Sequence, residues 1–358
     1  MSETGIGIIG CGVISGIYLQ NIARLPGIAL RGVADMRREA AEKAATDHGV
    51  PALSVDELLA RDDIDIVVNL TVPAAHAPVG RQILGAGKSL YLEKPLSASL
   101  GEAQALVDLA RDRNLGIGCA PDTFMGGGHQ AARAAIDAGR IGTPIGGTAT
   151  LMLPGHERWH PNPDFYYSAP GGGPLMDMGP YYLTGLVNLL GPVAEVSALS
   201  SRPRTQRTIA TGARAGEKVP VELDTHILGL LAFESGPIVQ MAMSFDVQGH
   251  WQSPIEVYGT EGSMRVPDPN RFDGAVELLG GEVLEAADRP YGADNWRGLG
   301  LCDMAAALRE GRGFRADAAL ALHVLEIIDA IDRAAAGRNS IRVESRCDRP
   351  APIEREIA

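Results

Sequence analysis

The chain has 358 residues, of which 45% are hydrophobic and 21% are charged, and its formal net charge at pH 7 is -12. The length accommodates two domains of ordinary size, and the composition is typical of a globular protein rather than a disordered or fibrous one. The negative charge argues against nucleic acid or an anionic membrane surface as a partner.

The sequence carries no signal for a membrane or for export. No apolar run approaches the roughly 20 residues that a membrane helix needs, and the first apolar segment begins by Ile6 without a basic leader. The cysteines are scattered without CxxC spacing, which favours reduced thiols over a disulfide framework. We therefore expect a cytoplasmic protein. The cysteines are Cys11, Cys119, Cys302 and Cys347.

The first 121 residues alternate apolar strands with helical patterns. Predicted strands cover residues 5–9, 29–34, 64–70, 89–92 and 116–119, and predicted helices cover 15–25, 38–48, 79–84 and 101–113. Ser54, with Glu57 three residues later, predicts a capped start for one further short helix. Strands separated by helices imply right-handed crossovers and a parallel sheet. We predict an α/β fold class, with residues 1–121 as an N-terminal domain.

The pattern changes in residues 122–358, which we predict to be a second domain. A helix over 131–138 precedes longer strands over 145–153, 225–233, 238–245 and 255–258, and helices over 302–309 and 318–335 follow. Gly236 and Pro237 predict a hairpin between two of these strands. The second domain is therefore predicted to be α+β, built on an open, mainly antiparallel sheet with helices on one face.

The first predicted strand ends in Gly10-Cys11-Gly12-Val13-Ile14-Ser15. Gly10 and Gly12 permit a tight turn and let backbone N–H groups approach a pyrophosphate. The third position of the motif is Ser15, which is small but is not glycine. Asp35 lies at the end of the second strand, about 20 positions after Ser15, which is the spacing of a carboxylate that binds an adenosine ribose. The loop predicts a dinucleotide site; the alternative is a glycine-rich turn without a ligand.

The charges after the second strand bear on which dinucleotide is bound. Asp35 favours NAD, because a carboxylate repels the 2'-phosphate of NADP. Arg37 and Arg38 keep NADP open, since either could clamp that phosphate, or one could stack on the adenine. We expect NAD.

Lys94 follows the fourth predicted strand, at the sheet edge where open α/β sheets bind their ligands. Hydride transfer from an alcohol to nicotinamide needs a group that removes the hydroxyl proton. A free lysine has a pKa of about 10.4, which burial or the positive charge of an oxidised nicotinamide would lower. Lys94 is therefore a candidate proton-handling group; the alternative is a surface lysine paired with Glu93.

Two polar segments of the second domain allow more than one interpretation. Residues 156–160 have the His-Glu-x-x-His spacing of zinc peptidases, but that chemistry needs a helix, which Pro161 disfavours. We predict no metal site and instead a loop that binds a sugar-like substrate or, alternatively, packs against a neighbouring subunit. The basic cluster of Arg202, Arg204 and Arg207 is interpreted as a solvated loop.

A series of motifs follows in order along nearly the whole chain. They are Gly10-Cys11-Gly12-Val13-Ile14-Ser15, Asp35, Thr71-Val72-Pro73 with His76, Glu93-Lys94-Pro95, Gly171-Gly172-Gly173-Pro174-Leu175-Met176-Asp177-Met178-Gly179 and Tyr258-Gly259-Thr260-Glu261-Gly262. Together they resemble the glucose–fructose oxidoreductase, inositol dehydrogenase and rhizopine-catabolism (Gfo/Idh/MocA) family. The resemblance implies an N-terminal Rossmann domain, a C-terminal α/β domain with an open sheet, tightly bound NAD or NADP, and sugar, cyclitol or related polyol substrates.

The resemblance also implies residue roles. Lys94 corresponds to the catalytic lysine, and Asp177 would orient substrate hydroxyls or a catalytic partner. Many members carry histidine four residues after this aspartate, where the chain has Tyr181. The Tyr181 phenol could replace that histidine, His160 could supply an imidazole instead, or Tyr181 could be a packing aromatic on a helix starting near Pro180.

The predicted site residues fall into three overlapping groups. The catalytic residues are Lys94, Tyr181 and Asp177. The cofactor-binding residues are Gly10, Cys11, Gly12, Val13, Ile14, Asp35, Met36, Arg37, Leu70, Thr71, Pro73, His76, Glu93 and Lys94. The substrate-binding residues are Lys94, Asp122, Arg158, Trp159, His160, Tyr166, Asp177 and Tyr181.

The combined expectation is an NAD-dependent dehydrogenase that moves a hydride between nicotinamide and a hydroxyl or carbonyl carbon of a sugar, sugar derivative or cyclitol. The alternative is a redox-neutral, NAD-dependent glycosidase or lyase that oxidises a glycoside transiently. A third hypothesis, a non-catalytic NAD-binding regulator, is disfavoured by Lys94 and Asp177. An exposed sheet face would need covering, so we expect a homodimer or homotetramer.

Overall fold

The computed structural model describes residues 3–168 and 171–357, which divide into two compact units. The first unit comprises the described residues of Met1–Met125, Asp294–Leu322 and Ile353–Ala358, and the second comprises those of Gly126–Ala293 and His323–Pro352. The sequence pattern placed one boundary after residue 121. The structure also returns two later segments to the first unit, because helical periodicity does not specify the domain on which a helix packs.

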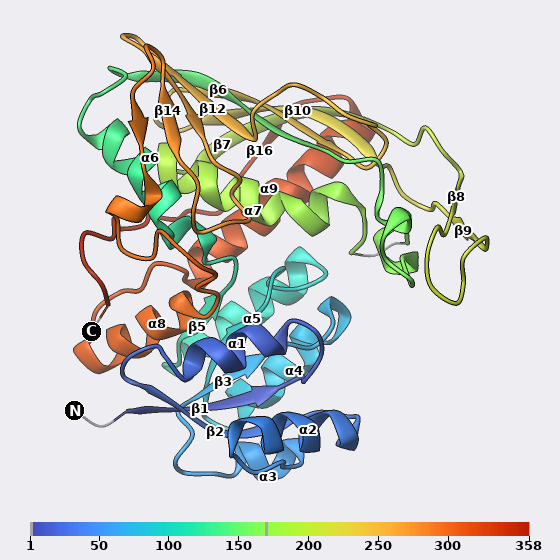
Figure 1. The fold of residues 1–358 in the computed structure, drawn as a ribbon, viewed down its shortest axis with the longest axis vertical. Helices are drawn as coiled ribbons and strands as arrows, with labels where there is room; N and C mark the ends of the chain where they lie inside the picture. Colours follow the sequence, from blue (N-terminus) through green and yellow to red (C-terminus); the bar gives the residue numbers. More distant parts are fainter. Residues whose placement is uncertain (1–2, 169–170, 358) are drawn as a thin grey trace. The chain divides into compact units, whose positions relative to one another are not determined.

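The first unit is built on a parallel sheet of strand order β2-β1-β3-β4-β5 (Figure 1). A single parallel bridge between Val33 and Ala52 extends the sheet beyond β2, which gives the doubly wound order of a Rossmann sheet. The predicted fold of the N-terminal domain is confirmed. Its elements are β1 (Thr4–Ile9), α1 (Ser15–Ile22), β2 (Ile28–Ala34), α2 (Arg38–His48), α3 (Val55–Leu59), β3 (Ile66–Asn69), α4 (Pro73–Gly85), β4 (Ser89–Leu92), α5 (Leu100–Asp112), β5 (Ile117–Cys119), η1 (Thr123–Met125) and α8 (Leu299–Glu310).

The central strands of this sheet position the candidate site. Every residue of β1, β3 and β4 is buried, as in strands that helices cover on both faces. The strand order reverses between β1 and β3, and in open α/β sheets a ligand crevice forms at this point, beyond the carboxyl ends of the strands. The Gly10 loop follows β1 and Lys94 follows β4, so both lie at that edge.

The second unit contains a nine-stranded sheet of order β15-β14-β13-β12-β6-β11-β10-β7-β16. The β6–β11 pair is parallel and the other pairs are antiparallel, so the predicted mainly antiparallel sheet is confirmed, as is the hairpin of β10 and β11. The elements are α6 (Gly127–Asp137), β6 (Pro144–Met152), η2 (His156–Arg158), η3 (Asp164–Tyr166), α7 (Gly173–Leu190), β7 (Val193–Ser201), β8 (Gln206–Thr208), β9 (Lys218–Pro220), β10 (His226–Phe233), β11 (Ile238–Ser244), β12 (Ile255–Gly259), β13 (Ser263–Val266), β14 (Val276–Leu278), β15 (Val283–Leu284), η4 (Ala286–Asp288) and β16 (Ile341–Arg342); α9 (Ala318–Gly337) contributes residues to both units.

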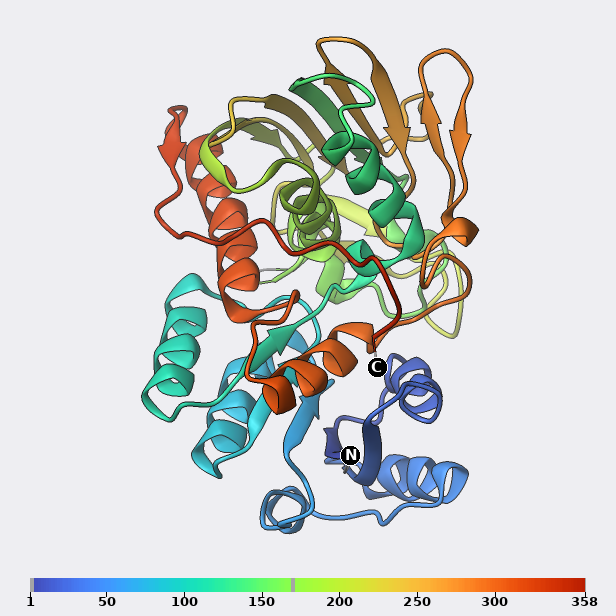
Figure 2. The ribbon, with the colours of Figure 1, turned by 90° about the vertical axis from the view of Figure 1, so that its left-hand side faces the viewer.

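Helices α6 and α7 pack on one face of the nine-stranded sheet (Figures 1 and 2). The other face exposes Leu199 of β7, Leu228 and Leu230 of β10, and Ile238 of β11. Leu228 pairs with Leu199 in the strand register, which places both on the same face. The second unit therefore carries an apolar sheet face that no helix of the described residues covers in these views.

Helix α7 begins at Gly173, which corrects the expectation of a helix starting near Pro180. Pro174 occupies the first turn, where proline is favoured, and Pro180 lies inside the helix. Proline favours a helix start, but a helix that is already supported by tertiary packing can contain a proline. Within residues 3–168 and 171–357, no helix is long and apolar enough to cross a membrane.

Candidate active site

Gly10, the residue after β1, lies where no side chain fits. Its φ is 103°, in the left-handed region that favours glycine. A Cβ atom added there would lie 2.7 Å from the carbonyl carbon and oxygen of Leu70, at the end of β3. A Cβ atom on Gly12, by contrast, would meet no atom within 4 Å. The loop therefore presses on the neighbouring strand at Gly10 and leaves open space at Gly12, where a pyrophosphate could approach the backbone.

The start of α1 also fits a dinucleotide. The Ser15 hydroxyl donates to the Gly12 carbonyl at 2.7 Å and closes the turn, while Ile14 at the N-cap makes no side-chain capping bond. The first N–H groups of such a helix are donors for a phosphate. Val13 and Met36 flank this edge with fully exposed apolar side chains, on which the flat face of an adenine or nicotinamide ring could lie.

Asp35, which follows β2, holds the Gly10–Gly12 loop through hydrogen bonds. One of its carboxylate oxygens accepts the Cys11 N–H and the other accepts the Arg37 N–H, each at 2.7 Å. A carboxylate has about four acceptor positions, so Asp35 can still accept hydrogen bonds from ribose hydroxyls. Burial, followed by the charge of Asp35, raises the pKa of the Cys11 thiol to about 11, and the thiol is therefore protonated at neutral pH. Arg38 donates to Glu42 at 2.8 Å.

Asn69 and His76 shape the loop after β3. The Asn69 side-chain oxygen accepts from the Thr71 hydroxyl at 2.7 Å, and its amide donates to the His76 carbonyl at 3.2 Å. The His76 ring is fully buried, with its nitrogens 2.7 Å from the Pro95 carbonyl and 3.1 Å from the Thr71 carbonyl. Burial lowers the pKa of His76. His76 therefore ties the Thr71 loop to the segment after Lys94, and its predicted contact with the cofactor stays a prediction.

Lys94 is held through its neighbours. The Glu93 carboxylate is buried and accepts from the Tyr18 hydroxyl at 2.8 Å and from the Lys94 N–H at 3.1 Å. The Lys94–Pro95 peptide bond is cis. Because Tyr18 lies on α1, its hydrogen bond connects the backbone at Lys94 to the helix that follows the dinucleotide loop. The Lys94 side chain is partly exposed, as a side chain that exchanges a proton with a substrate must be.

The structure gathers most of the predicted cofactor-binding residues at the carboxyl edge of the parallel sheet. This edge is where the Rossmann fold binds its dinucleotide. They are Gly10, Cys11, Gly12, Val13 and Ile14 after β1; Asp35, Met36 and Arg37 after β2; Leu70, Thr71 and Pro73 after β3; and Glu93 and Lys94 after β4.

Asp122, for which substrate binding stays a prediction, is buried and contacts the start of α8. Only 1% of its surface is exposed. One carboxylate oxygen accepts the N–H groups of Gly298 and Gly300, each at 2.9 Å, and the Tyr91 hydroxyl at 3.3 Å. Gly298 is the N-cap of α8, so Asp122 satisfies the free donors at the start of that helix. Sequence spacing cannot reveal this contact, because α8 is remote from Asp122 in the chain.

Asp177 and Tyr181 lie one turn apart on α7 and project from the same side of the helix. Tyr181 is buried, whereas Asp177 is partly exposed. Asp177 accepts a hydrogen bond from His156 Nε2 at 3.1 Å. Both residues belong to the second unit and Lys94 to the first, and their proposed pairing with Lys94 stays a prediction.

His156 is the site residue that the sequence analysis missed. Its Nδ1 accepts the indole N–H of Trp159 at 3.2 Å, so the proton is on Nε2 and is donated to Asp177. The ring also packs against Tyr166 and Phe245, with centroids 4.1 Å and 4.5 Å away. The His-Glu-x-x-His spacing gives no sign of the aspartate partner, which lies on α7. In the structure this segment is the 3₁₀ turn η2, and no group of at least three potential metal ligands occurs among the described residues.

The remaining predicted substrate contacts surround His156. His160 packs edge-on against Trp159 and Tyr166, and its Nδ1 accepts the Asn162 N–H at 3.1 Å. The imidazole that contacts Asp177 is His156, and the suggestion that His160 supplies the imidazole missing at Tyr181 stays a prediction. Trp159 is 60% exposed, so it offers an aromatic surface for a sugar ring to stack on.

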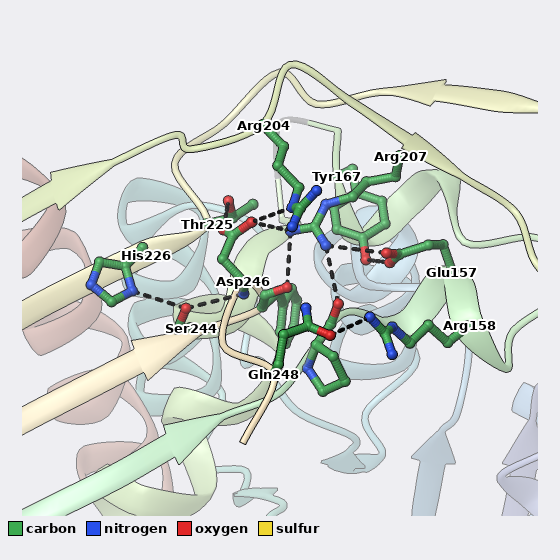
Figure 3. A network of polar contacts seen from close by, with 12 residues as sticks. Glu157, Arg158, Tyr167, Arg204, Arg207, Thr225, His226, Ser244, Asp246 and Gln248 are labelled. Carbon is green, nitrogen blue, oxygen red and sulfur yellow. Dashed lines mark hydrogen bonds and ion pairs between the residues drawn. The ribbon is translucent and has the colours of Figure 1, made fainter. Parts of the chain in front are cut away.

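Arg207 is buried, which corrects the interpretation of a solvated loop for this residue, whereas Arg202 and Arg204 are exposed as expected. Its side chain is 3% exposed and forms ion pairs with Glu157 at 3.1 Å and Asp246 at 2.6 Å (Figure 3). The Tyr167 hydroxyl donates to Glu157 and accepts the His156 N–H at 2.9 Å. The network fastens η2, and with it His156, to the end of β11. Sequence spacing alone could not reveal partners that the fold brings together.

Comparison with known proteins assigns the two parts of the chain to one family. Residues 4–119 match the oxidoreductase family with an NAD-binding Rossmann fold, and residues 129–265 match the GFO/IDH/MocA C-terminal domain. A dTDP-3,4-didehydro-2,6-dideoxy-alpha-D-glucose 3-reductase of Streptomyces violaceoruber is 30% identical over 354 residues, covering 92% of this chain and 95% of the relative.

Two further similarities extend over most of the chain. An inositol 2-dehydrogenase of Saccharopolyspora erythraea is 27% identical and covers 74% of each chain. The structure of a levoglucosan dehydrogenase in complex with NADH and L-sorbose aligns with a TM-score of 0.83 and 22% identity, over 96% of this chain and 100% of that one, and therefore shares its fold. The protein belongs to the Gfo/Idh/MocA family of oxidoreductases, and its N-terminal domain is an NAD-binding Rossmann domain.

Proposed function

We propose that the protein is an NAD-dependent oxidoreductase of a sugar, sugar derivative or cyclitol. The observation that carries the proposal is Lys94, which follows a central strand of the Rossmann sheet and is braced by the buried Glu93–Tyr18 contact. The relatives named above act on a deoxysugar nucleotide and on inositol, which supports a polyhydroxylated substrate.

The residues at the sheet edge would hold NAD in preference to NADP. The backbone at Gly12 and the start of α1 would bind the pyrophosphate, and Asp35 would bind the adenosine ribose. Asp35 would repel a 2'-phosphate, and Arg38 already donates to Glu42 at 2.8 Å. When bound, NAD supplies the site that accepts or returns the hydride.

Each polar group has a role in this proposal. Lys94 removes the proton from the reacting hydroxyl in the oxidative direction and returns it in the reductive direction. Asp177 accepts hydrogen bonds from substrate hydroxyls, in an orientation that His156 maintains. Tyr181, one turn after Asp177, is the phenol available as a second proton carrier. Trp159 offers a surface for the sugar ring.

We further propose that the protein is a homo-oligomer. The open face of the nine-stranded sheet presents Leu199, Leu228, Leu230 and Ile238, side chains that are each more than a third exposed. Soluble monomers rarely expose a large contiguous apolar face, and such a face usually marks an interaction surface. Pairing with the same face of a second copy would bury it in a two-fold interface, the commonest arrangement of homo-oligomers.

The test of the catalytic role is Lys94→Met. Because general acid–base catalysis contributes about a hundredfold or more, we expect at least that loss in kcat, with the affinity for NAD retained. Activity is measured as NADH formation over a panel of sugars and cyclitols, and cofactor affinity by calorimetric titration. Lys43→Met is the matched control, since Lys43 is an exposed residue of α2 paired with Asp47.

The same assay distinguishes the outcomes. Full turnover in Lys94→Met would remove the lysine from the mechanism. Glycoside cleavage by the unmodified protein without NADH accumulation would identify the redox-neutral glycosidase or lyase instead. A protein that binds NAD but neither oxidises a sugar or cyclitol nor cleaves a glycoside would contradict both the dehydrogenase and the glycosidase or lyase hypothesis.

A further inference from the structure

A cavity of about 530 Å³ lies in the second unit, beside the turn that carries His156. Its lining includes the three arginines Arg158, Arg204 and Arg207, the acidic Glu157, and the polar residues Gln206 and Thr208. The volume is within the range of small-molecule sites, about 300–1,000 Å³. The three arginines come from two segments distant in the chain, and Figure 3 shows their side chains gathered around Asp246 and Gln248.

Arg207 contributes little free charge to this cavity. It forms ion pairs with Glu157 at 3.1 Å and with Asp246 at 2.6 Å, and donates to the Pro154 and Phe245 carbonyls. Its side chain is almost completely buried. Two carboxylates therefore neutralise Arg207, and its guanidinium is a fixed part of the cavity wall.

Arg204 shares its acidic partner, Asp246, with Arg207. Its Nε lies 3.4 Å from the Asp246 oxygen that already pairs with Arg207, and the other Asp246 oxygen accepts the Thr225 hydroxyl at 2.5 Å. The Arg204 side chain is 53% exposed. One carboxylate thus serves two guanidinium groups, and most of the charge of Arg204 remains available.

Arg158 is paired with a neutral group. Its Nη2 donates to the Gln248 side-chain oxygen at 2.5 Å, which fixes the guanidinium without neutralising it. Among the described residues, no acidic side chain forms an ion pair with Arg158. With Glu157 and Asp246 as the adjoining carboxylates, three positive groups face two negative ones. The cavity therefore carries an excess of positive charge.

We propose that this cavity binds the anionic group, a phosphate or a carboxylate, of the substrate. Guanidinium groups bind both kinds of oxyanion through paired N–H donors, and a partly enclosed site strengthens the interaction relative to open solvent. Glu157 and Arg158 directly follow His156, whose ring contacts Asp177, so the cavity adjoins the residues that we propose to orient substrate hydroxyls. The inference rests on the proposed function and narrows its substrate class to anionic sugars, namely sugar phosphates, sugar nucleotides or sugar acids.

The first experiment compares matched neutral and anionic substrates. NADH formation is measured for a sugar, its phosphate and its uronic acid, with the unmodified protein and with Arg158→Gln, Arg204→Gln and the double variant. We expect a higher kcat/KM for one of the anionic forms, and a fall in the anionic-to-neutral ratio of about tenfold or more in the double variant. The phosphate and the uronate distinguish the two sources of the anion. Arg202→Gln, in the same segment but outside the lining of the cavity, should keep the ratio of the unmodified protein.

The second experiment does not depend on turnover. Inorganic phosphate is titrated calorimetrically into the NAD-saturated protein, so that the pyrophosphate-binding loop is already filled. We expect the double variant to bind phosphate at least tenfold more weakly than the unmodified protein or Arg202→Gln, with thermal unfolding confirming that the variants are folded. Equal phosphate affinity in all variants, or turnover without preference for an anionic substrate, would overturn this inference while leaving the proposed oxidoreductase intact. Absence of any sugar turnover alongside variant-sensitive phosphate binding would overturn the proposed function alone.

Discussion

Among the individual residues, His156 shows most clearly how a side chain's role depends on its partners. Its ring lies between the Trp159 indole, which donates to Nδ1 at 3.2 Å, and the Asp177 carboxylate, 3.1 Å from Nε2. A ring held on both sides has one tautomer and one orientation. His156 thereby limits the positions of Asp177, the residue that we propose to bind substrate hydroxyls.

Replacing His156 should therefore impair catalysis through the position of Asp177. We expect His156→Leu to lower kcat/KM about tenfold, the effect of losing one hydrogen bond to a charged group. His156→Gln should recover much of this loss, because its amide can donate where Nε2 does. The measurement is kcat/KM as a function of pH for the two variants.

His160 provides the comparison for this prediction. It contacts Trp159 and Tyr166 edge-on, whereas His156 has the contact with Asp177. A larger loss of activity in His160→Leu than in His156→Leu would contradict the positioning role of His156 and would return the imidazole function to His160.

At the scale of secondary-structure elements, the backbone after β1 is shaped by its contact with the end of β3. Gly10 presses on the Leu70 backbone, while Gly12 in the same loop has no neighbour within 4 Å of an added Cβ atom. Asp35, from the end of β2, holds the intervening Cys11 N–H at 2.7 Å. Three strand ends therefore shape the loop, and its two glycines are needed for different reasons.

Alanine substitutions should separate these two reasons. Gly10→Ala should destabilise the fold by about 1–3 kcal/mol, because its backbone conformation is strained for alanine and its Cβ atom would collide with Leu70. Gly12→Ala should unfold at the temperature of the unmodified protein but bind NAD more weakly, since the new methyl group enters the space proposed for the pyrophosphate. Thermal unfolding and NAD titration measure the two effects, and unchanged NAD affinity in Gly12→Ala would refute the placement of the pyrophosphate.

At the scale of the whole molecule, the chain does not divide at one point. Residues 294–322 and 353–357 belong to the same compact unit as the Rossmann sheet. Hydrogen bonds within that unit hold the segment 294–322 in place, because Asp122 accepts the N–H groups of Gly298 and Gly300 at the start of α8. The first unit thus includes a helix that the sequence analysis assigned to the second domain.

The apolar sheet face of the second unit should control assembly. Leu228→Lys with Leu230→Lys places two charges on that face, and we expect the double variant to have half or a quarter of the mass of the unmodified protein in solution. Light scattering coupled to size-exclusion chromatography makes the measurement. Leu279→Lys, another exposed leucine that lies after β14, is the control and should leave the mass unchanged. An unmodified protein that is already monomeric would rule out the homo-oligomer.

The stability of the second unit should depend on pH through His129. The ring is fully buried on α6, and burial lowers its pKa from 6.5 to about 4. Between these values the unfolded chain binds a proton and the folded one does not, so the free energy of unfolding should fall as the pH drops from about 6.5 to about 4. The full contribution is about 3 kcal/mol.

Denaturant unfolding at pH 7 and pH 5 tests this dependence. The unmodified protein should lose more unfolding free energy over this interval than His129→Gln, whose side chain does not titrate. The comparison of the two differences removes the contribution of all other titrating groups and the direct cost of the substitution. Equal pH dependence in both proteins would show that His129 titrates alike in the folded and unfolded states.

The sequence by itself determined the features that depend on neighbouring residues. The Gly10 loop, Asp35 after β2 and the Ser54–Glu57 capping box of α3 could be predicted because each follows from local periodicity or from backbone chemistry within one turn. The family resemblance rests on such motifs and was confirmed.

Only the tertiary structure decided which distant polar groups meet. His156 and Asp177 are separated by 21 positions, Arg207 and Asp246 by 39, and Asp122 and Gly298 by 176. Burial removes water as a partner, so each buried group in these pairs must find a protein partner, and the fold determines which one lies within reach. Sequence spacing describes neighbours along one element, and it contains no information on the strand ends and helix starts that packing brings side by side.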